Sequence, residues 1–191
     1  MRDSMRIALV AKKGGVGKST LSLLLYAALR HAGRTVSLID WDVQGTSTKA
    51  LAVLGQTAVA DGAEIVIYDT PPNLEHAAMA TAIRNADLCL VVTSPAPADV
   101  WEAEEAVAFA KSRNPRAVVR LVFNKVRRGT VLGRLMEDTA RMVPAPVLGA
   151  SLSARECYQH AVAQGWKALD GPAREEVLQV ALAVLAQPVK G

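Results

Sequence analysis

Residues 12–20, Lys-Lys-Gly-Gly-Val-Gly-Lys-Ser-Thr, have the composition of a loop that binds phosphate groups. Their three glycines allow the backbone to turn so closely that successive N–H groups point at phosphate oxygens. A helical stretch follows the loop, and the positive end of that helix lies at the same place. We expect Lys18 to contact the β- and γ-phosphates of a nucleotide, and the Ser19 hydroxyl to ligate Mg²⁺.

Three aspartates follow this loop at the ends of apolar runs. Asp40 closes the run 36–40, Asp42 lies two residues further on, and Asp69 closes the run 65–69. Hydrolysis of a γ-phosphate requires a metal ion held in place and an attacking water oriented in line. Carboxylates at the tips of buried strands can serve either purpose, although aspartates at strand ends are also common as simple caps. Their order after the loop favours the chemical interpretation.

An amide side chain ends another apolar run. Asn124 follows Leu121-Val122-Phe123, and its amide offers both the donor and the acceptor needed to read an adenine edge. A turn residue at the end of a strand is the alternative.

The elements that must position these residues alternate along the chain. Apolar runs of strand length lie at 7–11, 36–40, 65–69, 88–93, 118–124 and 147–150, and stretches of helical length lie at 20–31, 74–85, 100–112, 131–142, 155–168 and 174–186. The stretch 46–63 is the least readable and holds at most one helix. This pattern predicts an α/β fold, a doubly wound parallel β-sheet flanked by helices. Such sheets bind ligands at the carboxyl ends of their strands, where the candidate residues lie.

Length and composition set the class of protein. The 191 residues, 51% of them hydrophobic, predict one domain spanning 1–191. No apolar run approaches the roughly 20 residues that span a bilayer, and the N-terminus lacks the features of a signal peptide, so we expect a cytoplasmic protein. Cys89 and Cys157 lack the paired spacing of a metal or cluster site and are expected to be free thiols.

Positive charge is concentrated in one part of the chain. Between Lys111 and Arg155 there are ten Lys or Arg residues, against only Glu137 and Asp138. Such a concentration of positive charge favours a surface that binds a polyanion. A solvated basic face without a partner is the alternative.

The phosphate-binding loop resembles that of the deviant Walker A family of P-loop ATPases, which includes ParA, MinD and the nitrogenase iron protein and has the motif K-G-G-x-G-K-[ST]. Lys12 stands where the ordinary P-loop has glycine, and Lys13 is the additional lysine of the family. The resemblance implies that Lys13 acts in trans on the nucleotide of a dimer partner, and that Lys13 and Lys18 take part in catalysis. It implies ATP binding by Lys13, Gly14, Gly15, Val16, Gly17, Lys18, Ser19, Thr20 and Asn124.

The aspartates resemble the two switch segments of that family, D-x-D-P-Q-G and apolar-apolar-x-D-[TCG]-[PA]. The resemblance implies that Asp42 positions or activates the attacking water. It implies that Asp40 and Asp69 support the Mg²⁺ shell with Ser19, through waters. Val43 replaces the usual proline, which loosens the expected switch geometry without removing a reacting group.

The segment 93–101, Thr-Ser-Pro-Ala-Pro-Ala-Asp-Val-Trp, resembles the P-x-P-x-D-x-[WF] segment of small, ParF-like partition ATPases. The resemblance as a whole spans residues 6–186 and is weak beyond Val143. It implies a slow, partner-stimulated ATPase whose ATP-induced sandwich homodimer binds nonspecific DNA and, with a ParB-like or cargo-adaptor protein, segregates a plasmid, a chromosome or another cargo. In the ATP state it would be associated with the nucleoid. Arg113, Arg116, Arg127, Arg128, Arg134 and Arg155 are the candidates for phosphate contacts with DNA.

Other functions in the family fit the sequence less well. A MinD-like regulator that cycles on a membrane requires a basic amphipathic tail, whereas residues 177–191 have no basic stripe and are typical of a packed helix, so no stable membrane association is expected. An electron-transfer ATPase would need cluster cysteines in glycine-rich contexts. An ATP-dependent ligase is disfavoured by Lys13. The sequence does not identify the cargo.

Overall fold

The chain folds around a five-stranded parallel sheet. The computed structural model describes residues 4–134 and 136–188. The strands lie in the order β2-β3-β1-β4-β5 and comprise β1 Met5–Val10, β2 Val36–Asp40, β3 Ile65–Asp69, β4 Leu88–Thr93 and β5 Val118–Phe123. β1 is in the middle, paired with β3 on one side and β4 on the other, so the sheet grows in both directions from it. The parallel α/β fold predicted from the sequence is confirmed.

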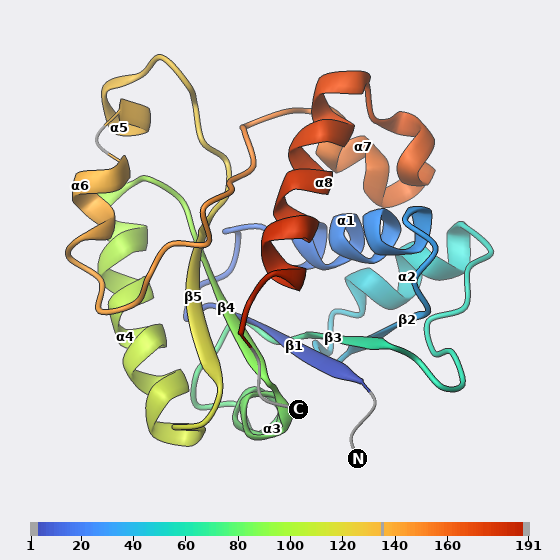
Figure 1. Cartoon of the computed structure of the whole chain (residues 1–191), viewed down its shortest axis with the longest axis horizontal. Coiled ribbons are helices and arrows are strands. Elements are labelled where there is room, and N and C mark those ends of the chain that lie inside the picture. Colours follow the sequence, from blue (N-terminus) through green and yellow to red (C-terminus); the bar gives the residue numbers. More distant parts are fainter. Residues whose placement is uncertain (1–3, 135, 189–191) are drawn as a thin grey trace.

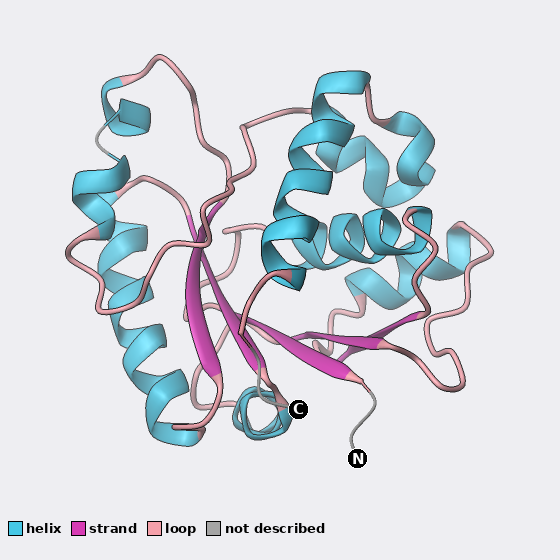
Figure 2. Ribbon diagram, viewed as in Figure 1, coloured by secondary structure: helices cyan, strands magenta, loops and turns pink. Residues whose placement is uncertain are grey.

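The helices cover both faces of the sheet, as Figures 1 and 2 show. α1, α2, α7 and α8 form one layer, and α3, α4 and α6 lie in the other. The bounds are α1 Lys18–His31, α2 Thr46–Val53, α3 Ala77–Asn85, α4 Pro97–Arg113, α5 Val131–Arg134, α6 Met136–Ala140, α7 Cys157–Gln164, the 3₁₀ helix η1 Gly165–Ala168 and α8 Gly171–Leu185. None of these helices is long and apolar enough to cross a membrane.

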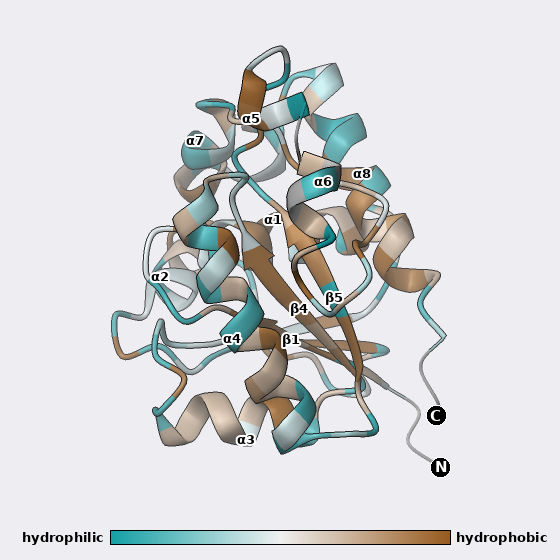
Figure 3. Ribbon diagram, turned by 90° about the vertical axis from the view of Figure 1, so that its left-hand side faces the viewer, coloured by the Kyte–Doolittle hydropathy of each residue, from teal (hydrophilic) through white to brown (hydrophobic). Residues whose placement is uncertain are grey.

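Alternate strand residues belong to two separate cores. Ile7 and Leu9 of β1 pack under α1, whereas Ala8 and Val10 pack on the opposite face, and all four are fully buried. Both faces of each central strand are therefore apolar, which explains the continuous rather than alternating hydrophobic runs of the sequence. Figure 3 shows these hydrophobic strands between the two helical layers.

The structure differs from the sequence-based expectation after β5. Residues 147–150 do not form a strand, and only Val147 makes a bridge to β5. Pro146 has no N–H to donate to a ladder, and Gly149 turns the chain with a φ of 72°. The helix expected at 131–142 is divided into the short α5 and α6, with residue 135 outside the described part. The helix hidden in the stretch 46–63 is α2.

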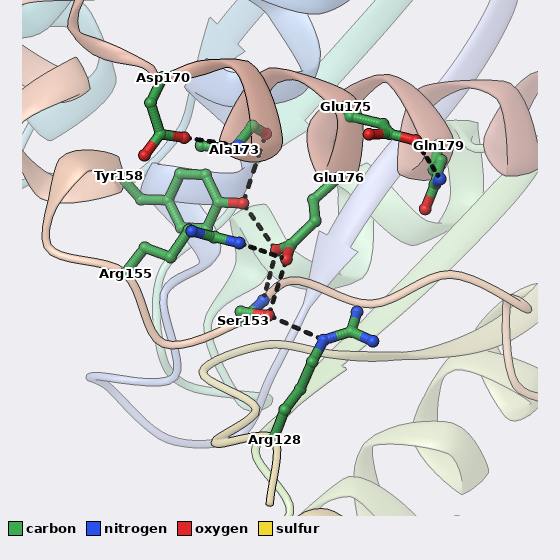
Figure 4. Close-up of polar contacts among 9 residues, drawn as sticks. All are labelled: Arg128, Ser153, Arg155, Tyr158, Asp170, Ala173, Glu175, Glu176 and Gln179. Carbon is green, nitrogen blue, oxygen red and sulfur yellow. Dashed lines mark hydrogen bonds and ion pairs between the residues drawn. The ribbon is translucent and has the colours of Figure 1, made fainter.

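The last helix is joined to the segment after β5 by a carboxylate, Glu176 of α8 (Figure 4). Its Oε2 accepts hydrogen bonds from the Ser153 backbone N–H and the Tyr158 hydroxyl, both at 2.9 Å. Its Oε1 accepts from the Ser153 hydroxyl at 2.9 Å and from Arg155 Nη2 at 3.0 Å. Burial alone would raise the pKa of Glu176, but these donors outweigh it and lower the pKa to about 2. Arg128 Nε in turn donates to the Ser153 hydroxyl at 3.1 Å.

The Glu176→Gln variant is expected to lose about 2–3 kcal/mol of unfolding free energy at pH 7, because it removes hydrogen bonds to a buried charged acceptor. The folded-state pKa lies below the unfolded value, so this stabilisation is fully present above the ordinary glutamate pKa of 4.5 and is lost as the pH falls toward about 2. Urea unfolding of both proteins at a series of pH values measures the difference. A difference that stays constant from neutral pH down to acid would contradict the assignment. Glu175→Gln on the same helix is the matched control, because Glu175 is exposed and accepts only a long hydrogen bond, 3.4 Å from Gln179 Nε2, among the described residues.

Candidate nucleotide-binding site

The carboxyl ends of the strands border a cleft of about 830 Å³. The P-loop (residues 12–20) follows β1, Asp42 follows β2 and Pro72 follows β3, because parallel strands present these ends at the same edge of the sheet. The segment from Ser153 to Val162 forms the opposite wall. The lining residues are Gly14, Gly15, Gly17, Lys18, Ser19, Thr20, Asp42, Pro72, Asn124, Lys125, Arg127, Ser153, Ala154, Arg155, Glu156, Tyr158, Gln159 and Val162. Four of them are cations and only two are acids, which suits a polyanionic ligand.

Gly17 of the P-loop lies so close to Asn124 that only glycine fits at this position. Gly17 has a φ of 93°, and a Cβ on it would lie 2.2 Å from Asn124 Nδ2. α1 begins directly after Gly17 and has neither a side-chain cap nor an acidic residue in its first turn. The N–H groups of this turn therefore remain available for an anion.

Lys18 and Asp69 place two charges in the interior beside the loop. The Lys18 side chain is buried, with 7% exposure, and no described acid lies within ion-pair distance of it. Burial lowers the pKa of Lys18, and the nearby Asp69 and Asp42 oppose this effect. Asp69 is completely buried, and burial raises its pKa against the effect of the Ser47 and Ser19 hydroxyls. An anionic ligand at Lys18 would compensate its cost of desolvation.

The acidic side chains also suit a magnesium ion. Asp69 Oδ2 accepts a hydrogen bond of 2.6 Å from Ser47, whereas its Oδ1 is buried and has no hydrogen-bond partner in the described part of the chain. Ser19 lines the cleft nearby. Oxygen ligands and water-mediated carboxylates are what Mg²⁺ prefers, and the free Oδ1 can accept from a metal-bound water. Among the described residues, no three acids, histidines or cysteines gather to hold a metal directly.

Asp40 and Asp42 shape the loop between β2 and α2. The two oxygens of Asp40 accept backbone N–H groups of Asp42 at 3.0 Å and Thr48 at 2.9 Å, so Asp40 fastens the start of α2. Asp42 Oδ1 accepts from the Gln44 N–H at 3.0 Å, and its side chain lines the cleft. Asp42 is thus in place to reach a water in the cleft. Asp40 is thus a structural cap in this structure, and its place in a metal shell stays a prediction.

Lys13 lies outside the cleft. Its Nζ forms an ion pair of 3.1 Å with Asp99 of α4, whose other oxygen accepts from the Ser94 hydroxyl at 2.6 Å. The Asp99 carboxylate raises the pKa of Lys13. Lys12 makes a similar pair with Glu105, at 2.7 Å. The second lysine of the P-loop therefore does not contact the nucleotide region of its own chain.

Asn124 lines the cleft directly beside the P-loop. Its Nδ2 donates to the Val16 carbonyl at 2.9 Å, and its Oδ1 accepts from the Lys125 N–H at 2.8 Å. One N–H of the amide and the remaining lone pairs are left for a ligand. Base recognition by Asn124 stays a prediction, and the role visible in the structure is that of a tie between β5 and the P-loop.

The basic segment divides into two groups. Arg127 and Arg155 line the cleft, and Arg113 stacks over Phe109 at 4.9 Å. Arg128 and Arg134 lie on the loop and short helix that follow β5, and neither forms an ion pair with a described acid. The concentration of charge in the sequence is thus shared between the nucleotide cleft and the surface beside it.

Several residues that line or support the cleft could not be predicted from the sequence. Ser47 was hidden in the stretch that was hardest to read, although its hydroxyl contacts Asp69. Tyr158 belongs to the weakly patterned region after Val143. Lys125 directly follows Asn124, and that adjacency was the signal available for it.

The comparisons with known proteins agree with this geometry. Residues 7–167 match the model of the CobQ/CobB/MinD/ParA nucleotide binding domain. The chain is 29% identical over 182 residues to the maintenance of carboxysome distribution protein A of Halothiobacillus neapolitanus, covering 83% of this chain and 84% of that protein.

Two solved structures share the fold. The MinD cell division protein of Aquifex aeolicus superposes with a TM-score of 0.79 at 17% identity, covering 98% of this chain and all of that one. The ATP complex of a variant McdA from Cyanothece superposes with a TM-score of 0.73 at 13% identity, covering 99% of both chains. Because the family model spans most of the chain, including the P-loop and the wall of the cleft facing it, this protein belongs to the ParA/MinD-type family of P-loop ATPases, the CobQ/CobB/MinD/ParA nucleotide-binding domain family.

Proposed function

We propose that this protein is an ATP-dependent positioning ATPase that binds Mg-ATP in the cleft, closes into a homodimer and hydrolyses ATP slowly until a partner protein accelerates the reaction. The observation that carries the proposal is the P-loop itself, with the buried Lys18 and the uncapped first turn of α1 facing the cleft. The similarity to a carboxysome distribution protein and to cell division proteins supports a role in placing a cargo.

Hydrolysis requires Asp42 and the metal shell. In the proposed reaction, water attacks the γ-phosphorus, the bond to the β–γ bridging oxygen breaks, and ADP and phosphate leave. Asp42 lines the cleft and would orient that water. Ser19 would hold Mg²⁺ directly, and Asp69 would hold it through a water. The ion would neutralise charge on the phosphates.

The position of Lys13 supports the proposed dimerisation. Its ammonium is paired with Asp99 of α4 and does not line its own cleft. A second subunit facing the cleft would receive this lysine at its phosphates. A triphosphate then has cations on both sides, and closure depends on ATP because the γ-phosphate supplies the additional negative charge.

Lys13→Ala is expected to bind ATP but to remain monomeric, because it lacks the cation that crosses the interface. Asp42→Ala is expected to dimerise with ATP and then to release no phosphate. Light scattering with and without ATP, combined with a phosphate-release assay, measures both effects. Lys12→Ala is the matched control and should dimerise as the wild type does, since Lys12 pairs with the exposed Glu105. Identical oligomers for all four proteins in both conditions would refute the trans-acting lysine.

Nonspecific DNA is the proposed surface on which the dimer is retained. The exposed Arg128 and Arg134 form no ion pair with a described acid, and each keeps guanidinium N–H groups beyond its hydrogen bond to Ser153 or Gly129 that could contact phosphates. A partner of the ParB or cargo-adaptor kind would trigger hydrolysis and release. In the ATP state the protein would then be nucleoid-associated within the cytoplasm.

Binding to random-sequence duplex DNA at two salt concentrations should occur only with ATP, and should weaken steeply as salt rises. Arg134→Gln should reduce the slope of log affinity against log salt by about 1, the loss of one phosphate contact. Arg84→Gln, an exposed change on α3, is the control and should keep the wild-type slope. Absence of DNA binding with ATP, ADP and no nucleotide alike would refute the DNA role and favour a membrane or protein surface instead.

A further inference from the structure

Lys125 is the only non-glycine residue of the described chain with a positive φ, 56°. This left-handed backbone conformation is costly for a residue that has a Cβ, and it persists only where other contacts maintain it. At Lys125 those contacts lie on the P-loop side. Its backbone N–H donates to Asn124 Oδ1 at 2.8 Å, and its Nζ donates to the Gly15 carbonyl at 2.6 Å.

The ammonium of Lys125 contacts the P-loop at the carbonyl of Gly15. Gly15, with a φ of 83°, forms the turn of the loop, and its carbonyl oxygen carries partial negative charge beside the place for phosphates. The Lys125 ammonium donates to that carbonyl and so offsets its partial negative charge. Its side chain also lies close to Gly17, since a Cβ built there would be 3.8 Å from Lys125 Cε. Lys125 itself lines the cleft.

The two neighbours form a clamp on consecutive parts of the loop. Asn124 holds the Val16 carbonyl at 2.9 Å, and Lys125 holds the Gly15 carbonyl. Each contact joins two residues that are more than a hundred positions apart along the chain. The clamp therefore fastens the loop after β1 to the end of β5. Among the described residues, the hydrogen bonds of Lys125 go to Asn124 and Gly15 and not to Ser19, Asp42 or Asp69.

We propose that Lys125 is a positioning residue for nucleotide binding: it fixes the P-loop through the Gly15 carbonyl and adds a cation to the cleft, and so acts on ADP and ATP alike rather than on hydrolysis. This inference rests on the proposed binding of ATP in the cleft. The strained backbone of Lys125 is maintained because it places the ammonium on the loop.

Four variants test this role. Lys125→Met removes the charge and keeps most of the length, Lys125→Arg keeps the charge, and Lys125→Gly relieves the backbone strain while removing the side chain. Lys111→Met is the matched control, because Lys111 Nζ also donates to a backbone carbonyl, that of Pro144, away from the cleft. Affinities for ADP and ATP are measured by calorimetry, stability without nucleotide by thermal unfolding, and kcat and KM by phosphate release.

Lys125→Met should bind both nucleotides about tenfold more weakly, by similar factors, with KM raised and kcat at saturation nearly unchanged. Lys125→Arg should recover most of the affinity. Lys125→Gly should bind as weakly as Lys125→Met yet unfold at no lower temperature than the wild type, which a merely structural role would not produce. The control should bind as the wild type does.

Wild-type affinity in Lys125→Met, or in Lys125→Gly, would overturn the role of Lys125. A loss confined to ATP, or to kcat, would overturn it as well, because it would place Lys125 at the γ-phosphate. Failure of the wild-type protein to bind either nucleotide would instead refute the proposed function on which the inference rests.

Discussion

The cost of burying the Lys18 ammonium without an ion-pair partner is the constraint on which the site depends. Lys18 is 7% exposed, and the fully buried Asp69 leaves one oxygen without a donor. In an isolated chain both groups lose hydration that nothing in the described part of the protein fully replaces. Polyphosphate on one side and a hydrated Mg²⁺ on the other would supply the missing partners. The arrangement therefore favours a filled cleft over an empty one.

The rest of the fold maintains this arrangement. The parallel sheet brings the loops after β1, β2 and β3 to one edge, and the two apolar cores hold the strands rigidly in register. The Glu176 cluster fastens the far wall of the cleft to α8, while Asn124 and Lys125 fasten the P-loop to β5. Rigid support on both sides allows a small ligand to be held by backbone N–H groups and a few charges.

Much of the fold and of the P-loop could be predicted from the sequence because short-range patterns determine them. The continuous apolar runs of buried strands and the spacing of Gly14, Gly15 and Gly17 are local signals. The far wall of the cleft could not be predicted, because Ser153 and Tyr158 reach Glu176 only through tertiary packing. The wrong strand at 147–150 has a different, local origin: its apolar residues suit a strand, whereas Pro146 and Gly149, both visible in the sequence, interrupt the ladder.

The measurement that tests the central claim most directly is a calorimetric titration of the wild-type protein and Lys18→Met with Mg-ATP. The account predicts saturable binding by the wild type and a loss of about a hundredfold or more in the variant, because a desolvated charge partner of the phosphates is removed. It also predicts that Lys18→Met unfolds at the same or a higher temperature, since an uncompensated buried charge has been replaced. Equal affinities for Mg-ATP in the two proteins, with both folded, would contradict the account.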